Sequence, residues 1–187
     1  MEIWFAKKDA LADLLEMKIK LLSVFSLAMM LTFATNNGLL AKEASATVSP
    51  LFPKKILNSE GKTVSSKVLK DKIVGIYFSA QWCPPCRNFT PALVEFRDKN
   101  AKEFEVVFVS SDRSLEDQLK YMEKYGMKWY ALPHGSDEAN ELKKKYEVRG
   151  IPSLVIVDAG GNTITKNGRG DVSGNPSGAL ASWQKKS

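Results

Sequence analysis

The stretch YFSAQWCPPCRNFTP, from Tyr77 to Pro91, decides how this 187-residue chain can be interpreted. It contains the only two cysteines of the sequence, Cys83 and Cys86, with two prolines between them and Trp82 in front. Two such closely spaced thiols can act as metal ligands, as a structural cross-link or as a redox centre. Each possibility makes a different demand on the rest of the chain.

The metal and cross-link interpretations are the weaker ones. Zinc takes four protein ligands in structural sites and at least three in catalytic sites. The chain adds only one histidine, His134, which follows a proline in an expected loop and is predicted to be a plain surface residue. A disulfide between closely spaced residues closes a very small loop, so it constrains little of the unfolded chain. No metal is expected, and no cofactor beyond a redox-active Cys83–Cys86 disulfide.

The sequence on either side of the pair favours a redox centre. Before it, residues 72–79 (KIVGIYFS) form a nearly continuous apolar and β-branched run, which predicts a strand buried on both faces. After it, Pro84 and Pro85 suit the first positions of a helix, where a missing N–H costs nothing. The prolines also stiffen the loop that holds the two sulfur atoms.

A cysteine at the start of a helix is favoured as a thiolate by the backbone N–H groups and the helix dipole. We therefore expect Cys83 to be exposed and to act as the nucleophile. Cys86, one helical turn later, is placed to attack the mixed disulfide and release the partner. Trp82 either offers a flat apolar face beside the nucleophile or simply packs into the core. Further along, RGIPS places Pro152 before another apolar run, where a cis peptide bond in a tight turn is possible.

Hydrophobic periodicity predicts the remaining elements. Buried strands are expected over residues 103–111 (EFEVVFVSS) and 152–158 (PSLVIVD). Three helices are expected, each with one apolar side that faces inward. In the first helix this side consists of Phe89, Ala92, Leu93 and Phe96. The second helix is capped by Ser114 and has Leu115, Leu119 and Met122 on this side, and the third begins near Ser136 and has Ala139, Leu142 and Tyr146. Pro91 lies inside the first of these helices and is expected to bend it.

Further elements are expected before and after these strands and helices. An edge strand is expected before a turn at residues 59–61, a β-hairpin around residues 159–162, and a last helix over residues 177–184. The NGRGD stretch at residues 167–171 is interpreted as a turn. Together the elements predict an α/β fold with a central mixed sheet flanked by helices.

The N-terminal region has the three-part pattern of an export signal. Lys18 and Lys20 precede an apolar run over residues 21–34, and residues 44–46 (ASA) offer a cleavage site. The run is shorter than the roughly 20 apolar residues of a membrane span. We therefore expect a periplasmic or secreted protein cleaved near Ala46, with an uncleaved membrane tether through residues 17–41 as the alternative.

This signal sets the expected domain boundaries. Residues 1–46 form the targeting segment and residues 47–187 the folded domain. The sixteen residues before Met17 carry acidic side chains where a signal needs basic ones, which suggests that Met17 is the true start.

Composition and motifs exclude several other functions. The chain has 27 basic and 21 acidic residues, a net charge of +6, and the lysines are scattered instead of forming a stripe. We interpret them as a solvated surface and expect no nucleic-acid partner. Neither G-x-G-x-x-G nor a phosphate-binding loop is present. A monomer is expected.

These residues together resemble the thioredoxin superfamily, and within it the tryparedoxin and nucleoredoxin branch. The resemblance covers most of residues 72–172 and is most specific in W-C-P-P-C followed by R-x-F-T-P. It implies a thioredoxin fold, with Cys83 attacking and Cys86 resolving. It also implies a cis Pro152 that faces the cysteines, and a substrate strand bound by the backbone of Ile151.

The chain departs from ordinary thioredoxins at Tyr77, which takes the place of a buried aspartate. The proton acceptor for Cys86 is therefore open, with Glu147 and water as candidates. The expected export signal is also unlike the cytosolic tryparedoxins and more similar to extracytoplasmic bacterial thioredoxins.

The resulting expectation is a protein thiol–disulfide oxidoreductase in an exported compartment. It would act as a reductase or electron carrier on protein disulfides and would be recharged by an upstream electron donor. Two alternatives remain: a redox-gated protein-interaction module, as in nucleoredoxin-like proteins, and an oxidase or isomerase of secreted proteins.

Overall fold

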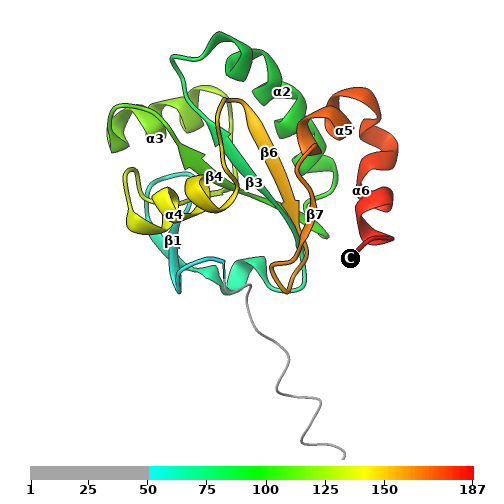
Figure 1. Ribbon diagram of the computed structural model, residues 1–187. Helices are drawn as coiled ribbons and strands as arrows, with labels where there is room; N and C mark the ends of the chain where they lie inside the picture. Colours follow the sequence, from blue (N-terminus) through cyan, green and yellow to red (C-terminus); the bar gives the residue numbers. More distant parts are fainter. Residues whose placement is uncertain (1–50) are drawn as a thin grey trace, which may run out of the picture. The chain divides into compact units, whose positions relative to one another are not determined.

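The computed structural model describes residues 51–187, so the expected signal segment and its cleavage site lie outside the described residues. Within residues 51–187 the chain forms a seven-stranded sheet in the order β2-β1-β5-β4-β3-β6-β7 (Figure 1). The strands are β1 (Lys55–Leu57), β2 (Thr63–Ser65), β3 (Ile73–Ser79), β4 (Phe104–Ser110), β5 (Tyr130–Ala131), β6 (Ser153–Val157) and β7 (Thr163–Thr165). The helical segments are η1 (Ser66–Leu69), α2 (Pro84–Lys99), α3 (Leu115–Lys124), α4 (Asp137–Lys145), α5 (Gly168–Gly174) and α6 (Pro176–Gln184).

The central strands make the sheet mixed. β3 and β4 are parallel, in a register that runs from Ile73 opposite Phe104 to Ser79 opposite Ser110. β3 pairs on its other side with β6 in the antiparallel direction. Every residue of β3 and β4 is buried, as their nearly continuous apolar sequences require. The predicted α/β fold with a mixed central sheet is confirmed.

Helices cover both faces of this sheet. The side chains of α2, α3, α5 and α6 form one core cluster with the sheet, and those of α4 and η1 form part of a second cluster. β3 contributes to both clusters because successive side chains of a strand point to opposite faces. Tyr77 belongs to the first cluster, whereas Ile76 and Phe78 belong to the second.

The strand at the sheet edge is not the one that the sequence suggested. The expected turn at residues 59–61 is present, and Gly61 takes a φ of 76°, which favours glycine. The strand before this turn, β1, pairs with both β2 and β5. β1 is therefore not an edge strand, because the chain after the turn folds back and covers its free side.

The inward face of α2 differs from the expected stripe at one position. The expected apolar residues Phe89, Leu93 and Phe96 are buried. Ala92 is exposed, and Thr90 is buried instead. Pro91 lies inside the helix, as expected. The stripe begins one turn earlier than the apolar pattern suggested, because Cys86 is its first buried member.

The expected stripe of α3 is wrong at its start. Leu115 is 44% exposed, and the buried residues of α3 are Gln118, Tyr121 and Met122. Polar side chains can be buried where they find hydrogen-bond partners. Gln118 Nε2 donates to the Leu132 carbonyl at 2.9 Å. The hydrophobic pattern could not reveal this partner, which lies in another segment.

The helix starts agree with the sequence. Ser114 and Ser136 cap α3 and α4, and each side chain accepts a backbone N–H from the first turn of its helix. The expected inward residues Ala139, Leu142 and Tyr146 are buried.

The C-terminal region contains more helix than expected. Residues 168–171 of the NGRGD stretch lie within α5, and α6 follows after Asn175, so the interpretation of the stretch as a plain turn is wrong. Trp183 of α6 is fully buried against Phe96 and Phe104, and its indole N–H donates to Asp171 Oδ2 at 2.9 Å. Glycine is a weak helix former, so packing against Trp183 and not local propensity stabilises α5. The region from residue 51 to residue 187 contains no helix long and apolar enough to cross a membrane.

A buried ion pair joins the last turns of α2 to β4. The Arg97 guanidinium donates twice to the Glu105 carboxylate, with both distances 2.8 Å, and Glu105 is almost fully buried. Lys72 Nζ lies 3.7 Å from the same carboxylate. A bidentate arginine compensates a buried carboxylate well, and removal of one partner leaves the other charge uncompensated.

We predict that Arg97→Ala lowers the free energy of unfolding by about 3 kcal/mol, because Glu105 then remains buried without its main partner. Urea denaturation measures the change. The control is Lys99→Ala, whose exposed pair with Glu95 should contribute less than about 1 kcal/mol. Equal losses in the two variants would show that the buried pair does not have the assigned role.

Candidate active site

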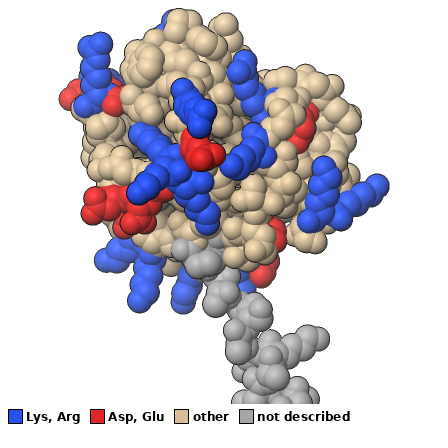
Figure 2. All heavy atoms as spheres, viewed as in Figure 1, with Lys and Arg blue, Asp and Glu red and all other residues tan. Residues whose placement is uncertain are grey.

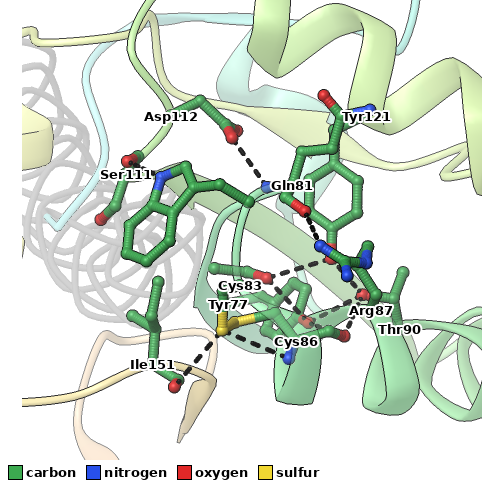
Figure 3. Close-up of a disulfide and its surroundings, with 12 residues drawn as sticks. Tyr77, Gln81, Cys83, Cys86, Arg87, Thr90, Ser111, Asp112, Tyr121 and Ile151 are labelled. Atoms are coloured by element: carbon green, nitrogen blue, oxygen red, sulfur yellow. Dashed lines mark hydrogen bonds between the residues drawn. A yellow bond between two sulfur atoms is a disulfide. The ribbon is translucent and has the colours of Figure 1, made fainter.

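The cysteine pair lies where β3 ends and α2 begins. Cys83 is the N-cap of α2, and its Sγ accepts the backbone N–H of Cys86 at 3.3 Å (Figure 3). Pro84 and Pro85 occupy the first two positions of the helix, as expected. The strand-to-helix placement inferred from the sequence is therefore confirmed.

Cys83 and Cys86 form a disulfide in this structure. The expectation that Cys83 is exposed is wrong for this oxidised state, because Cys83 is only 4% exposed and Cys86 is fully buried. Both sulfur-bearing residues pack with Ala80 and the partly buried Ile151. Cys83 is nevertheless the more accessible of the two.

The turn before β6 faces this disulfide. The Ile151–Pro152 peptide bond is cis, which confirms the expected isomer. The Ile151 carbonyl oxygen lies 3.6 Å from Cys83 Sγ (Figure 3). The paired residues of β6 begin at Ser153, so Ile151 lies outside the sheet pairing. The structure thus brings Ile151 next to Cys83, and the cis Pro152 directly follows it in the chain.

Trp82 lies at the surface beside the pair. Its side chain is 56% exposed, so simple core packing is not its role. Its indole Nε1 donates to the Ser111 carbonyl at 2.9 Å. This bond fixes the ring against the segment that follows β4 and leaves apolar surface open to solvent.

A buried hydroxyl cluster lies beneath the first turn of α2, formed by the side chains of Tyr77, Ser79, Thr90 and Tyr121 (Figure 3). Thr90 Oγ1 lies 2.9 Å from the Tyr77 hydroxyl and 2.6 Å from the Tyr121 hydroxyl. Thr90 also donates to the Cys86 carbonyl at 2.8 Å. The sequence singled out only Tyr77. Ser79 lies two residues further along the same strand, whereas Thr90 and Tyr121 come from α2 and α3 and meet Tyr77 only in the folded state.

The Tyr77 hydroxyl stays neutral in this cluster. Burial raises the pKa of Tyr77 far above its ordinary value, and the nearby Tyr121 adds to the shift. A neutral phenol cannot replace the base function of a carboxylate. The other candidate, Glu147, is exposed and has no hydrogen bond to Cys86. Among residues 51–187, no carboxylate forms a hydrogen bond with Cys86.

Asp112 links the segment after β4 to the chain just before the cysteines. Its Oδ1 accepts the backbone N–H of Gln81 at 2.7 Å (Figure 3). Its Oδ2 accepts the Ser110 hydroxyl at 2.7 Å. The side chain is 7% exposed. Burial raises the pKa of this carboxyl, and the hydrogen bonds from Ser110 and Gln81 oppose that rise. Nothing near Asp112 in the chain signals its burial, so the sequence alone does not reveal its role.

His134 and Lys143 support the same segment. His134 Nε2–H donates to the Asp112 carbonyl oxygen at 2.7 Å, and Lys143 Nζ donates to the Ser110 carbonyl at 2.8 Å. His134 is therefore partly buried, which corrects its interpretation as a plain surface residue. Its loop folds over the end of β4 because Leu132 N–H pairs with the Phe108 carbonyl. Residues 51–187 hold no group of three or more metal-ligating His, Cys, Asp or Glu side chains.

We predict a pH dependence of stability from Asp112. A raised pKa means that the folded state binds the proton of Asp112 more tightly than the unfolded state does. The stabilisation that this proton gives the folded state is therefore complete below the ordinary pKa of 3.8 and is lost as pH rises through the pKa of the folded state. The unfolding free energy of the wild type minus that of Asp112→Asn should therefore increase as pH falls from 7 toward 4. Urea denaturation of both proteins at several pH values measures this difference. A difference that shrinks on acidification would contradict the assignment.

Comparisons with known proteins agree with this geometry. Residues 71–163 match a family model described as thioredoxin-like. Nucleoredoxin of Danio rerio is 41% identical over 133 residues, which cover 68% of this chain but 31% of that protein. Tryparedoxin of Trypanosoma brucei brucei is 43% identical over 131 residues, which cover 68% of this chain and 90% of that protein. The chain therefore spans about a third of the nucleoredoxin and nearly all of the tryparedoxin.

Solved structures give the same result. A thioredoxin from Wuchereria bancrofti is 45% identical with a TM-score of 0.64, and the match covers 74% of this chain and 99% of that one. A tryparedoxin II in complex with glutathionylspermidine is 36% identical with a TM-score of 0.62, and the match covers 68% of this chain and 90% of that one. The chain belongs to the thioredoxin-like oxidoreductase family, with tryparedoxins and nucleoredoxins among its relatives.

Proposed function

We propose that this protein is a thiol–disulfide oxidoreductase that reduces disulfides of other proteins through Cys83 and Cys86. One observation carries the proposal: Cys83 Sγ caps α2, is bonded to Cys86, and lies next to the Ile151 carbonyl. A sulfur in this position is stabilised as a thiolate and lies beside unpaired backbone that can hold a substrate.

The first step is the attack of the reduced Cys83 thiolate on a substrate disulfide. The Cys86 N–H and the dipole of α2 stabilise this thiolate, since the N–H already points at Cys83 Sγ. A Cys83–substrate disulfide forms, and the first substrate sulfur leaves as a thiolate that takes a proton from water.

The second step closes the protein disulfide. Cys86 loses its proton, with water as the acceptor, and its thiolate attacks Cys83 Sγ to release the second substrate thiol. Two electrons have then passed from the protein to the substrate. The two substrate sulfurs have taken up two protons, of which one is balanced by the proton that Cys86 released and the other comes from solvent. The oxidised pair matches the disulfide in this structure. An upstream dithiol donor returns the pair to the reduced state.

Ile151 and Trp82 are proposed to position the substrate. Ile151 is not paired within the sheet, so its backbone can pair with an extended substrate segment. Trp82 offers an exposed apolar face whose orientation is held by the bond to Ser111.

We predict that Cys83→Ser lowers insulin-disulfide reduction to below about 1% of wild type, because the attacking sulfur is lost. Cys86→Ser should also stop turnover, but it should accumulate a covalent mixed disulfide, since the resolving thiol is missing. Non-reducing electrophoresis with mass spectrometry distinguishes the two variants, which serve as controls for each other.

Full activity in Cys83→Ser would rule out the mechanism. The direction of electron flow has its own criterion, the reduction potential of the Cys83–Cys86 pair. A value near about −270 mV supports a reductase, whereas a value near about −120 mV would mean an oxidase.

We further propose that the protein acts in an exported compartment as a monomer. The support is the signal pattern over residues 17–46, which lies outside the described residues. N-terminal sequencing of the protein from its native host should give a mature chain that begins just after Ala46. A mature chain that begins at Met1 would contradict export through this segment.

A further inference from the structure

A surface pocket lies beside the cysteine pair, and of its lining residues only Trp82 has a role in the mechanism above. It has a volume of about 530 Å³, and its lining includes Trp82, Arg87, Arg113, Asp117 and Lys124. Trp82 directly precedes Cys83, and Arg87 directly follows Cys86. A group bound in this pocket is therefore close to a disulfide that reacts with Cys83.

The pocket is cationic on the side that meets solvent. Its charged lining consists of Arg87, Arg113 and Lys124 against Asp112 and Asp117. Asp112 contributes little to the open surface, because both of its oxygens already accept hydrogen bonds from inside the protein. One partly buried carboxylate, Asp117, then faces three basic side chains.

Two of these basic side chains have no partner within the described part of the chain. Arg113 and Lys124 are exposed and form neither a hydrogen bond nor an ion pair with any side chain of residues 51–187. Lys120, on the same helix as Lys124, is instead paired with Glu116 at 2.6 Å. The positive charge of Arg113 and Lys124 is therefore available to a ligand.

The opposite side of the active site is also basic. Figure 2 shows Lys and Arg side chains gathered over α4 and the segment after it. The last turn of α4 contains Lys143, Lys144 and Lys145, and Arg149 lies two residues before Ile151. Glu147 is the only acidic residue between Lys143 and Ile151. Basic groups thus flank the cysteines from two directions.

We infer that this pocket is a substrate subsite that binds a carboxylate next to the reacting disulfide, so the protein prefers disulfides with acidic neighbours. The inference rests on the proposed function and names its substrate class. Arg113 and Lys124 determine this specificity by attraction of the anionic group, and Arg87 adds a third positive charge to the pocket lining. Only one of its terminal nitrogens is used internally, in a bond to the Gln81 carbonyl at 2.8 Å.

The test uses three small disulfides of similar size: anionic 3,3′-dithiodipropionate, neutral 2-hydroxyethyl disulfide and cationic cystamine. The full-length chain is reduced, freed of reductant and mixed with each disulfide. The second-order rate constant of its oxidation is measured by acid quenching, maleimide labelling and mass spectrometry. Each rate is divided by the rate of the same disulfide with dithiothreitol, which removes differences in intrinsic reactivity.

For the wild type, the normalised rate should be about fivefold higher with the anionic disulfide than with the cationic one at low salt. This preference should approach unity in 0.5 M NaCl, because salt screens exposed charges. Arg113→Glu/Lys124→Glu should reverse the preference, and Arg113→Gln/Lys124→Gln should abolish it. The matched control is Lys67→Glu/Lys102→Glu, which reverses two exposed charges at the other end of β3 and β4 and should retain the preference.

The outcomes separate this inference from the proposed function. If the wild type reacts with all three disulfides and the Arg113 and Lys124 variants keep its preference, the subsite is disproved and the oxidoreductase function stands. If the wild type shows no preference at low salt, the subsite is disproved as well. If the wild type reacts with none of the three disulfides but reduces insulin, the subsite is disproved and the oxidoreductase function stands. If it fails to reduce insulin as well, the proposed function fails, and the substrate class fails with it.

Discussion

The parallel register of β3 and β4 is the constraint on which the rest of the site depends. Because Ser79 pairs with Ser110, both strands end at the same level, and the Ser111 N–H donates to the Ser79 carbonyl at 2.9 Å. The chain that continues from β3 carries the cysteines, and the chain that continues from β4 carries Asp112. A shift of one residue would turn every side chain to the other face of the sheet and separate these two segments.

The sequence predicted the parts of the fold that local patterns encode. The continuous apolar runs specified β3, β4 and β6, since strands buried on both faces cannot tolerate polar interruptions. The prolines after Cys83 specified the start of α2, because few other positions accept two consecutive residues without an N–H. The cis bond at Pro152 followed from the resemblance and not from composition.

The missed parts are polar residues whose burial depends on distant partners. No local pattern in the sequence singles out Thr90, Tyr121 or Asp112, and only the fold brings their partners within hydrogen-bond distance. The exposure of Cys83 was misjudged for a related reason. A position at the start of a helix is usually exposed to solvent, but here Ile151, from a distant part of the sequence, packs against Cys83. No periodicity reveals such a contact.

Cys83 has two roles: it caps α2, and it is the proposed redox group. Its charge state changes whenever the disulfide opens or closes, so the cap of α2 changes with it. The folding equilibrium and the redox equilibrium then share a thermodynamic cycle. An interaction that makes the Cys83 thiolate a better cap than the disulfide stabilises the reduced form of the folded protein. The folded protein then becomes a stronger oxidant than its unfolded chain, by the same amount of free energy. Interactions in the first turn of α2 therefore affect both the stability of the fold and the reduction potential of the cysteine pair.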